Sequence, residues 1–124
     1  MKILSVDDSA IIRKIIRNGV ELLDYEFIEA GDGQEALAIL EESYNDIGLI
    51  LLDWNMPGMD GLDFLQKIKE NSVMQYVPVM MVTTESEKEN IIKAIQAGAI
   101  NYMVKPFTIE ELTKKIVECI GEGM

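Results

Sequence analysis

The chain alternates short apolar segments with longer segments in which apolar residues recur every three or four positions. Short apolar runs are typical of buried strands, and the longer periodicity is typical of amphipathic helices. The second predicted strand alternates polar and apolar residues, which indicates an edge strand with one face exposed to water. The predicted strands are Lys2 to Val6, Tyr25 to Ala30, Gly48 to Leu52, Val79 to Val82 and Ile100 to Val104.

A predicted helix follows each predicted strand, and most of these helices begin at a residue or pair that can cap their first backbone N–H groups. The third helix is expected from about Leu62 to Glu70, and Gly98 is expected to end the fourth. The expected capping residues are Ser9, the pair Asp32 and Glu35, the pair Ser86 and Glu89, and the pair Thr108 and Glu111. The apolar positions at helical spacing include Ile12, Ile16, Val20, Ala36, Leu40, Phe64, Leu65, Ile68, Ile91, Ile92, Ile95, Leu112 and Ile116.

Strands that alternate with helices predict a parallel sheet with helices on both faces and right-handed crossovers. The expected fold class is therefore a doubly wound α/β fold of the (βα)5 kind. A chain of 124 residues is the size of one domain, so we expect residues 1–124 to form a single domain without an output domain.

Composition excludes several classes of function. Eleven basic and twenty-two acidic residues give a net charge of -11, which opposes binding to nucleic acid or to an anionic membrane. The chain has no histidine, so any histidine chemistry must come from a partner. The single cysteine, Cys119, cannot form an internal disulfide and is expected to pack in a helix. Without a signal peptide or an apolar run of membrane-spanning length, we expect a cytoplasmic protein.

Chemically reactive residues stand at the carboxyl ends of four predicted strands. In an open parallel sheet, these ends meet at the crevice where ligands bind. The stretch around Asp53 is the clearest case, since an apolar run stops at this carboxylate and continues into a loop with proline and glycine. The residues at the four strand ends are Asp7 and Asp8, Asp53, Thr83 and Thr84, and Lys105.

Three carboxylates in one crevice repel each other by roughly 4 kcal/mol per pair at about 4 Å and an effective dielectric constant near 20. Lys105 supplies one positive charge, so a divalent cation is expected; oxygen ligands favour Mg²⁺, with Mn²⁺ or Ca²⁺ possible, over zinc. Magnesium commonly meets phosphate, which makes phosphoryl transfer the expected chemistry. Asp53 can act as a carboxylate nucleophile that forms an acyl phosphate.

Each residue taken alone also has a structural explanation. Asp7 or Asp8 can cap the first helix, Thr83 is a favourable strand residue, and Lys105 can be an exposed lysine. Asp60 precedes a glycine and a helix, so it is expected to be a cap or turn residue. The joint pattern at four strand ends is what indicates a functional site.

Several motifs together resemble the response regulator receiver domains of bacterial two-component systems, in particular single-domain chemotaxis regulators. The resemblance covers nearly the whole chain and implies a flavodoxin-like fold with strand order 2-1-3-4-5. The motifs that carry it are Asp53-Trp54-Asn55-Met56-Pro57, Asp60-Gly61, Glu89-Asn90-Ile91-Ile92, Gln96-Ala97-Gly98-Ala99 and Val104-Lys105-Pro106-Phe107-Thr108.

The resemblance implies that Asp53 accepts a phosphoryl group from the phosphohistidine of a histidine kinase, which agrees with the lack of histidine in this chain. Thr83 and Lys105 would bind the phosphoryl oxygens. The implied magnesium ligands are the side chains of Asp8 and Asp53, the backbone carbonyl of Asn55 and, directly or through water, Asp7.

The resemblance also implies a switch and a partner surface. Tyr102 matches the aromatic residue that turns inward on phosphorylation, although it can also be an ordinary strand aromatic. The implied partner surface consists of Lys88, Ile91, Tyr102 and Lys115. Ile91 can instead belong to the core, and Lys88 can be a solvated charge.

Three residues bear on the lifetime of the phosphate. Asn55 and Glu85 are expected to flank the path of the hydrolytic water and match a short-lived phosphate. Thr84 is bulkier than the alanine or glycine often found there in receivers, so access of water or of a phosphatase is expected to differ.

The expected function is a response regulator that signals by protein–protein contact, as a monomer, with a flagellar motor switch protein as the leading target in chemotaxis. It would catalyse only its own phosphorylation and dephosphorylation. A receiver that relays phosphate, or that binds a non-flagellar partner with or without phosphorylation, is an alternative.

An enzyme with an aspartyl-phosphate intermediate, such as a haloacid dehalogenase-type phosphatase, is the less favoured alternative. Such enzymes need a second acid two residues after the nucleophile, where this chain has Asn55, and no cap domain fits in its length. A nucleotide or flavin site is disfavoured because the loop after the first strand is acidic instead of glycine-rich.

Overall fold

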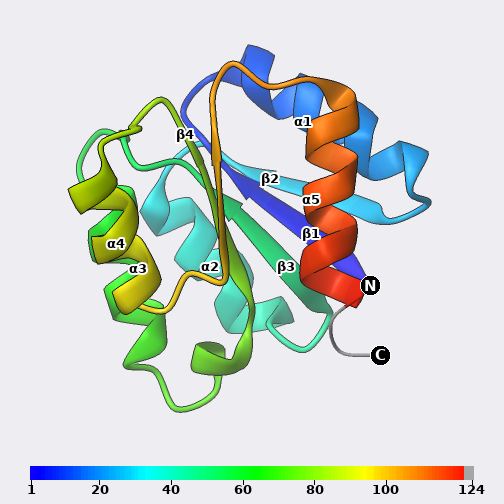
Figure 1. Cartoon of the computed structure of the whole chain (residues 1–124). Coiled ribbons are helices and arrows are strands. Elements are labelled where there is room, and N and C mark those ends of the chain that lie inside the picture. The colour runs from blue at the N-terminus through cyan, green and yellow to red at the C-terminus, as the bar shows by residue number, and fades with distance from the viewer. Residues whose placement is uncertain (122–124) are drawn as a thin grey trace.

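A five-stranded parallel sheet lies at the centre of the molecule (Figure 1). The computed structural model describes residues 1–121. The strand order is β2-β1-β3-β4-β5, which confirms the predicted topology and places β2 at an edge. The strands are β1 (Lys2–Val6), β2 (Glu26–Ala30), β3 (Ile47–Leu52), β4 (Val79–Thr83) and β5 (Asn101–Val104).

Helices cover both faces of this sheet, as predicted (Figure 1). Residues of α1 and α5 pack in one apolar cluster, whereas residues of α2, α3 and α4 pack in the other. The helices are α1 (Ala10–Leu22), α2 (Gly33–Ser43), α3 (Gly61–Lys69), α4 (Lys88–Gln96) and α5 (Ile109–Gly121), with a short 3-10 helix, η1 (Met74–Tyr76), before β4.

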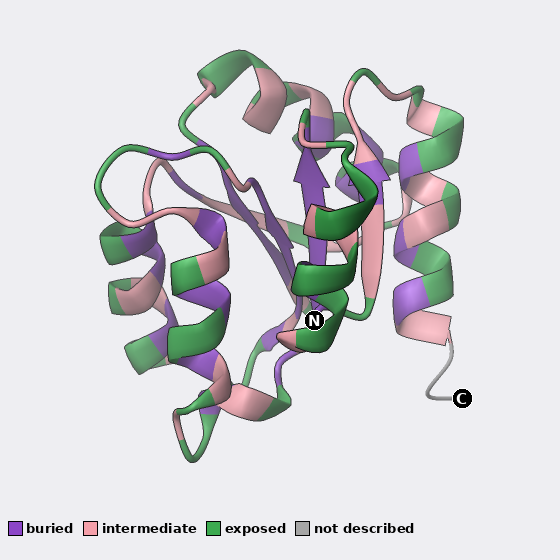
Figure 2. Ribbon diagram, turned by 60° about the vertical axis from the view of Figure 1, so that its left-hand side comes forward, coloured by how far each residue is buried: buried purple, intermediate pink, exposed green. Residues whose placement is uncertain are grey.

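Alternation along the strands explains the two clusters. Ile3 of β1 contributes to the α1 and α5 side, and the next residue, Leu4, contributes to the opposite side. Both side chains are fully buried. Figure 2 shows the central strands as buried and the outer faces of the helices as exposed. A strand covered on both faces favours apolar residues along its length, which explains the nearly continuous apolar runs of the inner strands.

Most of the expected helix caps are present. Ser9 accepts a hydrogen bond from the backbone N–H of Ile12, and Asp32 accepts one from Glu35. Thr108 likewise accepts from the backbone N–H of Glu111, at 3.0 Å. Because Ser9 caps α1, the alternative in which Asp7 or Asp8 caps that helix is not needed.

The predicted cap by Ser86 is wrong. Helix α4 has Glu87 as its N-cap residue, with no side-chain capping bond. The carboxylate of Glu85 instead organises this turn, because it accepts from the side-chain amide of Asn90 at 2.9 Å and from the Glu87 N–H at 3.4 Å.

Helix α4 also packs differently from the simplest apolar pattern. Its buried residue is Ala94, whereas Ile92 and Ile95 are 44% and 46% exposed. The small side chain of Ala94 lies in the core, whereas these two larger isoleucines are exposed. Gly98 has a φ of +116° just beyond the helix, which confirms the predicted glycine stop.

The carboxyl end of β3 and the start of α3 approach each other closely at Gly61. Its backbone N–H donates to the Trp54 carbonyl at 2.7 Å. A Cβ at Gly61 would lie 2.1 Å from the Asp53 carbonyl oxygen and 2.8 Å from the Trp54 Cα. Asp60 caps α3 by accepting from the Asp63 N–H at 2.8 Å, as predicted. This turn therefore fixes the backbone that carries Asp53.

We expect Gly61→Ala to lower the free energy of unfolding by about 1–3 kcal/mol, since the added methyl group would have to displace backbone atoms. Gly121→Ala in α5 is the matched control, because nothing lies within 4 Å of its Cβ position. Urea denaturation of both variants measures the difference. Equal unfolding midpoints for Gly61→Ala and the native protein would contradict this account of the turn.

Candidate functional site

The carboxyl ends of β1, β3 and β5 bring Asp7, Asp53 and Lys105 together. The Lys105 Nζ lies 2.7 Å from Asp7 Oδ2 and 3.3 Å from Asp53 Oδ2. Both carboxylates are buried, and the lysine side chain is only 11% exposed. A single ammonium group therefore bridges two buried carboxylates from strands that are neighbours in the sheet.

Asp8 completes an acidic cluster with Asp7 and Asp53. Each of the three offers a carboxylate oxygen, and these atoms lie within 4.8 Å of one another. Asp8 is exposed, so the cluster opens to solvent on its side. Three negative charges against one ammonium leave a net negative site of oxygen donors, which fits a hard divalent cation such as Mg²⁺.

Asp7 is the most constrained acid of the cluster. One of its carboxylate oxygens accepts from the Ser9 N–H at 2.9 Å, and the other accepts from Lys105. Burial nevertheless raises the pKa of Asp7 above its ordinary value, because desolvation outweighs these two hydrogen bonds. Holding Asp7 ionised inside the fold thus costs free energy, which a further cation would offset.

Asp53 is buried but keeps a defined orientation. Its Oδ1 accepts from the backbone N–H of Asn55 at 3.4 Å, and its Oδ2 faces Lys105. Asn55 itself is exposed. The carboxylate is therefore held at both oxygens, in the crevice where the sequence predicted it.

Thr83 lies at the end of β4, next to this crevice, and is fully buried. Its hydroxyl accepts a hydrogen bond from the backbone N–H of Glu85 at 3.2 Å. Within residues 1–121, no hydrogen bond joins Thr83 to Asp53. The next residue, Thr84, is exposed. The hydroxyl is thus tied to the loop that begins α4 instead of to the acids.

Tyr102 contacts the same loop from β5. Its hydroxyl donates to the backbone carbonyl of Glu85 at 2.7 Å. Burial, together with the negative charges of Glu85 and Asp53, raises the pKa of Tyr102 to about 12. Tyr102 and Thr83 thus both bond to the backbone of Glu85.

The remaining predicted residues lie along α4, β5 and α5. Lys88 is exposed at the start of α4, and Ile91 is half-buried one turn later. Lys115 of α5 donates to the side-chain oxygen of Asn101 on β5 at 3.3 Å. Ile91 is therefore neither fully buried nor fully exposed. The contact of Lys115 with Asn101 links α5 to β5.

Arg13 is a residue near the site that the sequence reasoning missed. It lies in the first turns of α1 and donates from Nη1 to the backbone carbonyl of Asp7 at 2.6 Å. A basic residue one turn after the cap Ser9 was the available signal, but spacing alone does not indicate that a side chain folds back onto a strand end.

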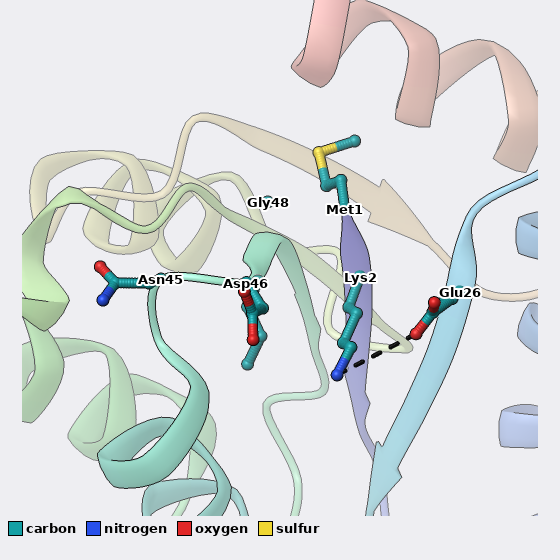
Figure 3. A pocket seen from close by; sticks show the side chains of 7 residues that line it. Met1, Lys2, Glu26, Asn45, Asp46 and Gly48 are labelled. Carbon is teal, nitrogen blue, oxygen red and sulfur yellow. Dashed lines mark ion pairs between the residues drawn. The ribbon is translucent and has the colours of Figure 1, made fainter.

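The pocket drawn in Figure 3 lies at the opposite end of the sheet. Its volume is about 560 Å³, and its lining residues precede or begin β1, β2 and β3. Lys2 and Glu26 form a 4.0 Å ion pair across it (Figure 3). This pocket lacks the convergent acids of the strand carboxyl ends, so its size does not make it the functional site.

No helix within residues 1–121 is long and apolar enough to span a bilayer.

Comparisons with known proteins agree with this geometry. The family model for the response regulator receiver domain matches residues 3–117. A curated relative, chemotaxis protein CheY1 of Helicobacter pylori, is 43% identical over 98% of both chains. The CheY homolog of Campylobacter jejuni is 40% identical over 99% of this chain and 95% of its own.

Solved structures give the same result. CheY4 of Vibrio cholerae is similar with a TM-score of 0.88 and 35% identity, over 95% of this chain and 97% of its own. The receiver domain of the Francisella response regulator 1452 has a TM-score of 0.88 and 28% identity, over 99% and 98% of the two chains. This chain therefore belongs to the response regulator receiver domain family.

Proposed function

We propose that this protein is a phosphorylation-switched response regulator whose phosphoacceptor is Asp53. The observation that carries the proposal is the bridging of Asp7 and Asp53 by Lys105 Nζ, with Asp8 completing the acidic cluster. The crevice offers a nucleophilic carboxylate, an ammonium group and oxygen donors for a cation. Membership of the response regulator receiver domain family supports the proposal.

The proposed step is transfer of a phosphoryl group from the phosphohistidine of a histidine kinase. An oxygen of Asp53 attacks phosphorus, a new O–P bond forms, and the N–P bond breaks with its electron pair left on the histidine. Lys105 already contacts the Asp53 carboxylate, so its ammonium is placed to bind a phosphoryl oxygen. A carboxylate nucleophile has no proton to lose, so the attack needs no general base.

Magnesium is the proposed cofactor, with Mn²⁺ as a substitute. Asp8, Asp53 and the backbone carbonyl of Asn55 would hold the ion, and Asp7 would bind it directly or through water. The bound ion would neutralise charge on the transferred phosphoryl oxygens. The fit is supported by the 4.8 Å clustering of the three carboxylates and by the exposure of Asp8.

The proposed switch couples Asp53 to the start of α4 through the backbone of Glu85. Thr83 would move its hydroxyl from the Glu85 N–H to a phosphoryl oxygen, and Tyr102 would follow the changed loop. Phosphorylation would then shift the population between two arrangements of α4, β5 and α5. To shift the population from 1:99 to 99:1, phosphorylation must stabilise the active arrangement relative to the inactive one by about 5.5 kcal/mol.

The proposed output is protein–protein contact in chemotaxis. Relatives at about 40% identity are named chemotaxis proteins, which favours a flagellar motor switch protein as the target. The proposed surface consists of Lys88, Ile91, Tyr102 and Lys115. A non-flagellar partner or phosphate relay uses the same acceptor site and differs only at this surface.

Loss of the phosphate is proposed to be self-catalysed and controlled by residues at the mouth of the site. Asn55 and Thr84 are exposed there, and Glu85 lies half-buried beside them. The side chain of Glu85 is bonded to Asn90, so it would have to leave that contact to approach a hydrolytic water.

The acceptor assignment is tested by incubation with a small phosphodonor and Mg²⁺. We expect stoichiometric labelling of the native protein and no labelling of Asp53→Asn, because an amide cannot form the acyl phosphate. Intact-protein mass spectrometry measures both. Equal labelling of the two proteins would contradict the assignment, and multiple turnover of a phosphate ester would favour a phosphatase.

The environment of Tyr102 is tested by alkaline titration. We expect the difference in tyrosinate absorbance between the native protein and Tyr102→Phe to have its midpoint near pH 12, because burial and two negative charges raise the pKa of Tyr102 to about 12. An unfolded tyrosine ionises near pH 10, so Tyr102 destabilises the fold progressively between these values. A rapid pH jump reads the ionisation before unfolding, and a midpoint near 10 would contradict the buried position of Tyr102 beside two negative charges.

A further inference from the structure

Arg13 of α1 makes two charge-assisted hydrogen bonds beside the acidic cluster. Its Nη1 donates to the backbone carbonyl of Asp7 at 2.6 Å, and its Nε donates to Glu29 Oε1 on β2 at 2.7 Å. The side chain is only 17% exposed. Hydrogen bonds of this kind are stronger than those between neutral groups, so the guanidinium is firmly placed.

The carbonyl that Arg13 holds belongs to the peptide bond between Asp7 and Asp8. The N–H of Asp7 is also fixed, because it donates to the Ala30 carbonyl of β2 at 3.1 Å. The Asp7 carboxylate is held by Ser9 and Lys105. Arg13 is therefore the contact that holds the Asp7–Asp8 peptide bond, and together with the Ser9 contact it constrains the direction in which the exposed Asp8 projects.

Glu29 anchors this arrangement to the sheet. In the register between β1 and β2, Glu29 pairs with Ser5. Ser5 precedes Asp7 by two residues. The Arg13 guanidinium thus joins α1, the edge strand β2 and the loop after β1 in one contact. A lysine could not reproduce this arrangement, because a single ammonium lacks the rigid fork of a guanidinium.

We propose that Arg13 is a positioning residue for magnesium binding, which orients the Asp7–Asp8 peptide so that both acids face the cation. The proposal rests on the magnesium site of the proposed function. Groups that hold metal ligands in place commonly change metal affinity by about tenfold or more when they are removed. Nothing in the proposal requires Arg13 to touch the cation or the phosphate.

Long-range electrostatics alone predicts the opposite direction for the change in Mg²⁺ affinity when Arg13 is removed. Arg13 is positively charged and lies beside a cation site, so removal of its charge should tighten Mg²⁺ binding if only long-range repulsion mattered. Removal of its hydrogen bond to the Asp7 carbonyl should weaken binding if orientation matters more. The direction of the change therefore separates the two effects.

Arg17 supplies a matched control on the same helix. It pairs with the same glutamate, Nη2 to Glu29 Oε2 at 3.7 Å, and its guanidinium lies 5.1 Å from the centre of the Phe27 ring. Neither of these contacts reaches Asp7. Arg17→Ala thus removes a similar charge and one partner of Glu29 without releasing the Asp7 carbonyl.

The test is isothermal titration calorimetry of the metal-free full chain with MgCl₂. We expect Arg13→Ala to weaken Mg²⁺ binding about tenfold and Arg17→Ala to stay within about twofold of the native protein. We expect Arg13→Lys, which keeps the charge, to weaken binding in the same direction as Arg13→Ala. Circular dichroism confirms that each variant is folded.

Three results would overturn the proposal: native or tighter affinity in Arg13→Ala, an equal loss in Arg13→Ala and Arg17→Ala, or native affinity in Arg13→Lys. The last comparison decides the matter if Arg13→Ala fails to fold. The titration of the native protein tests the proposed function separately. A native protein that does not bind Mg²⁺ would contradict the proposed function itself, whatever the variants do.

Discussion

The main physical constraint on this structure is the mutual repulsion of the carboxylates that lie close together at the carboxyl ends of β1 and β3. Asp7, Asp8 and Asp53 lie within reach of one cation, and Lys105 supplies the only ammonium that an ion pair places among them within residues 1–121. Burial of two of these acids makes their mutual repulsion stronger than it would be in water. The site thus stores unfavourable electrostatic energy that a bound cation or a change of charge on Asp53 can alter.

The surrounding fold holds this arrangement in place. Both faces of the inner strands are buried, so the sheet that positions the acids is rigid. The close approach of Gly61 to the Asp53 backbone and the contact of Arg13 with the Asp7 carbonyl fix the two acid-bearing loops. The loop after β4 differs, because Glu85 is bonded by Thr83 and Tyr102 on one side and begins the turn into α4 on the other.

Much of the fold could be predicted from apolar periodicity, because strands covered on both faces and helices with one buried face leave direct patterns. Asp53 and Lys105 were identifiable because each directly follows a predicted strand. The Ser86 cap could not be excluded from spacing, since the competing bonds of Glu85 depend on how the loop folds. The bond between Tyr102 and the Glu85 carbonyl joins residues 17 positions apart, so local patterns carry no signal for it. Arg13 is only six residues from Asp7, but its spacing does not show that its side chain folds back onto the end of β1.

We propose that a specifically bound divalent cation balances the excess negative charge at the strand ends. Calorimetric melting at increasing MgCl₂, with NaCl at matched ionic strength as the control, tests it most directly. We expect the melting temperature to keep rising with the logarithm of the Mg²⁺ concentration above the dissociation constant, and the added stability to be about 2.7 kcal/mol at a hundredfold excess over that constant. An equal rise in NaCl, or no rise with Mg²⁺, would contradict it.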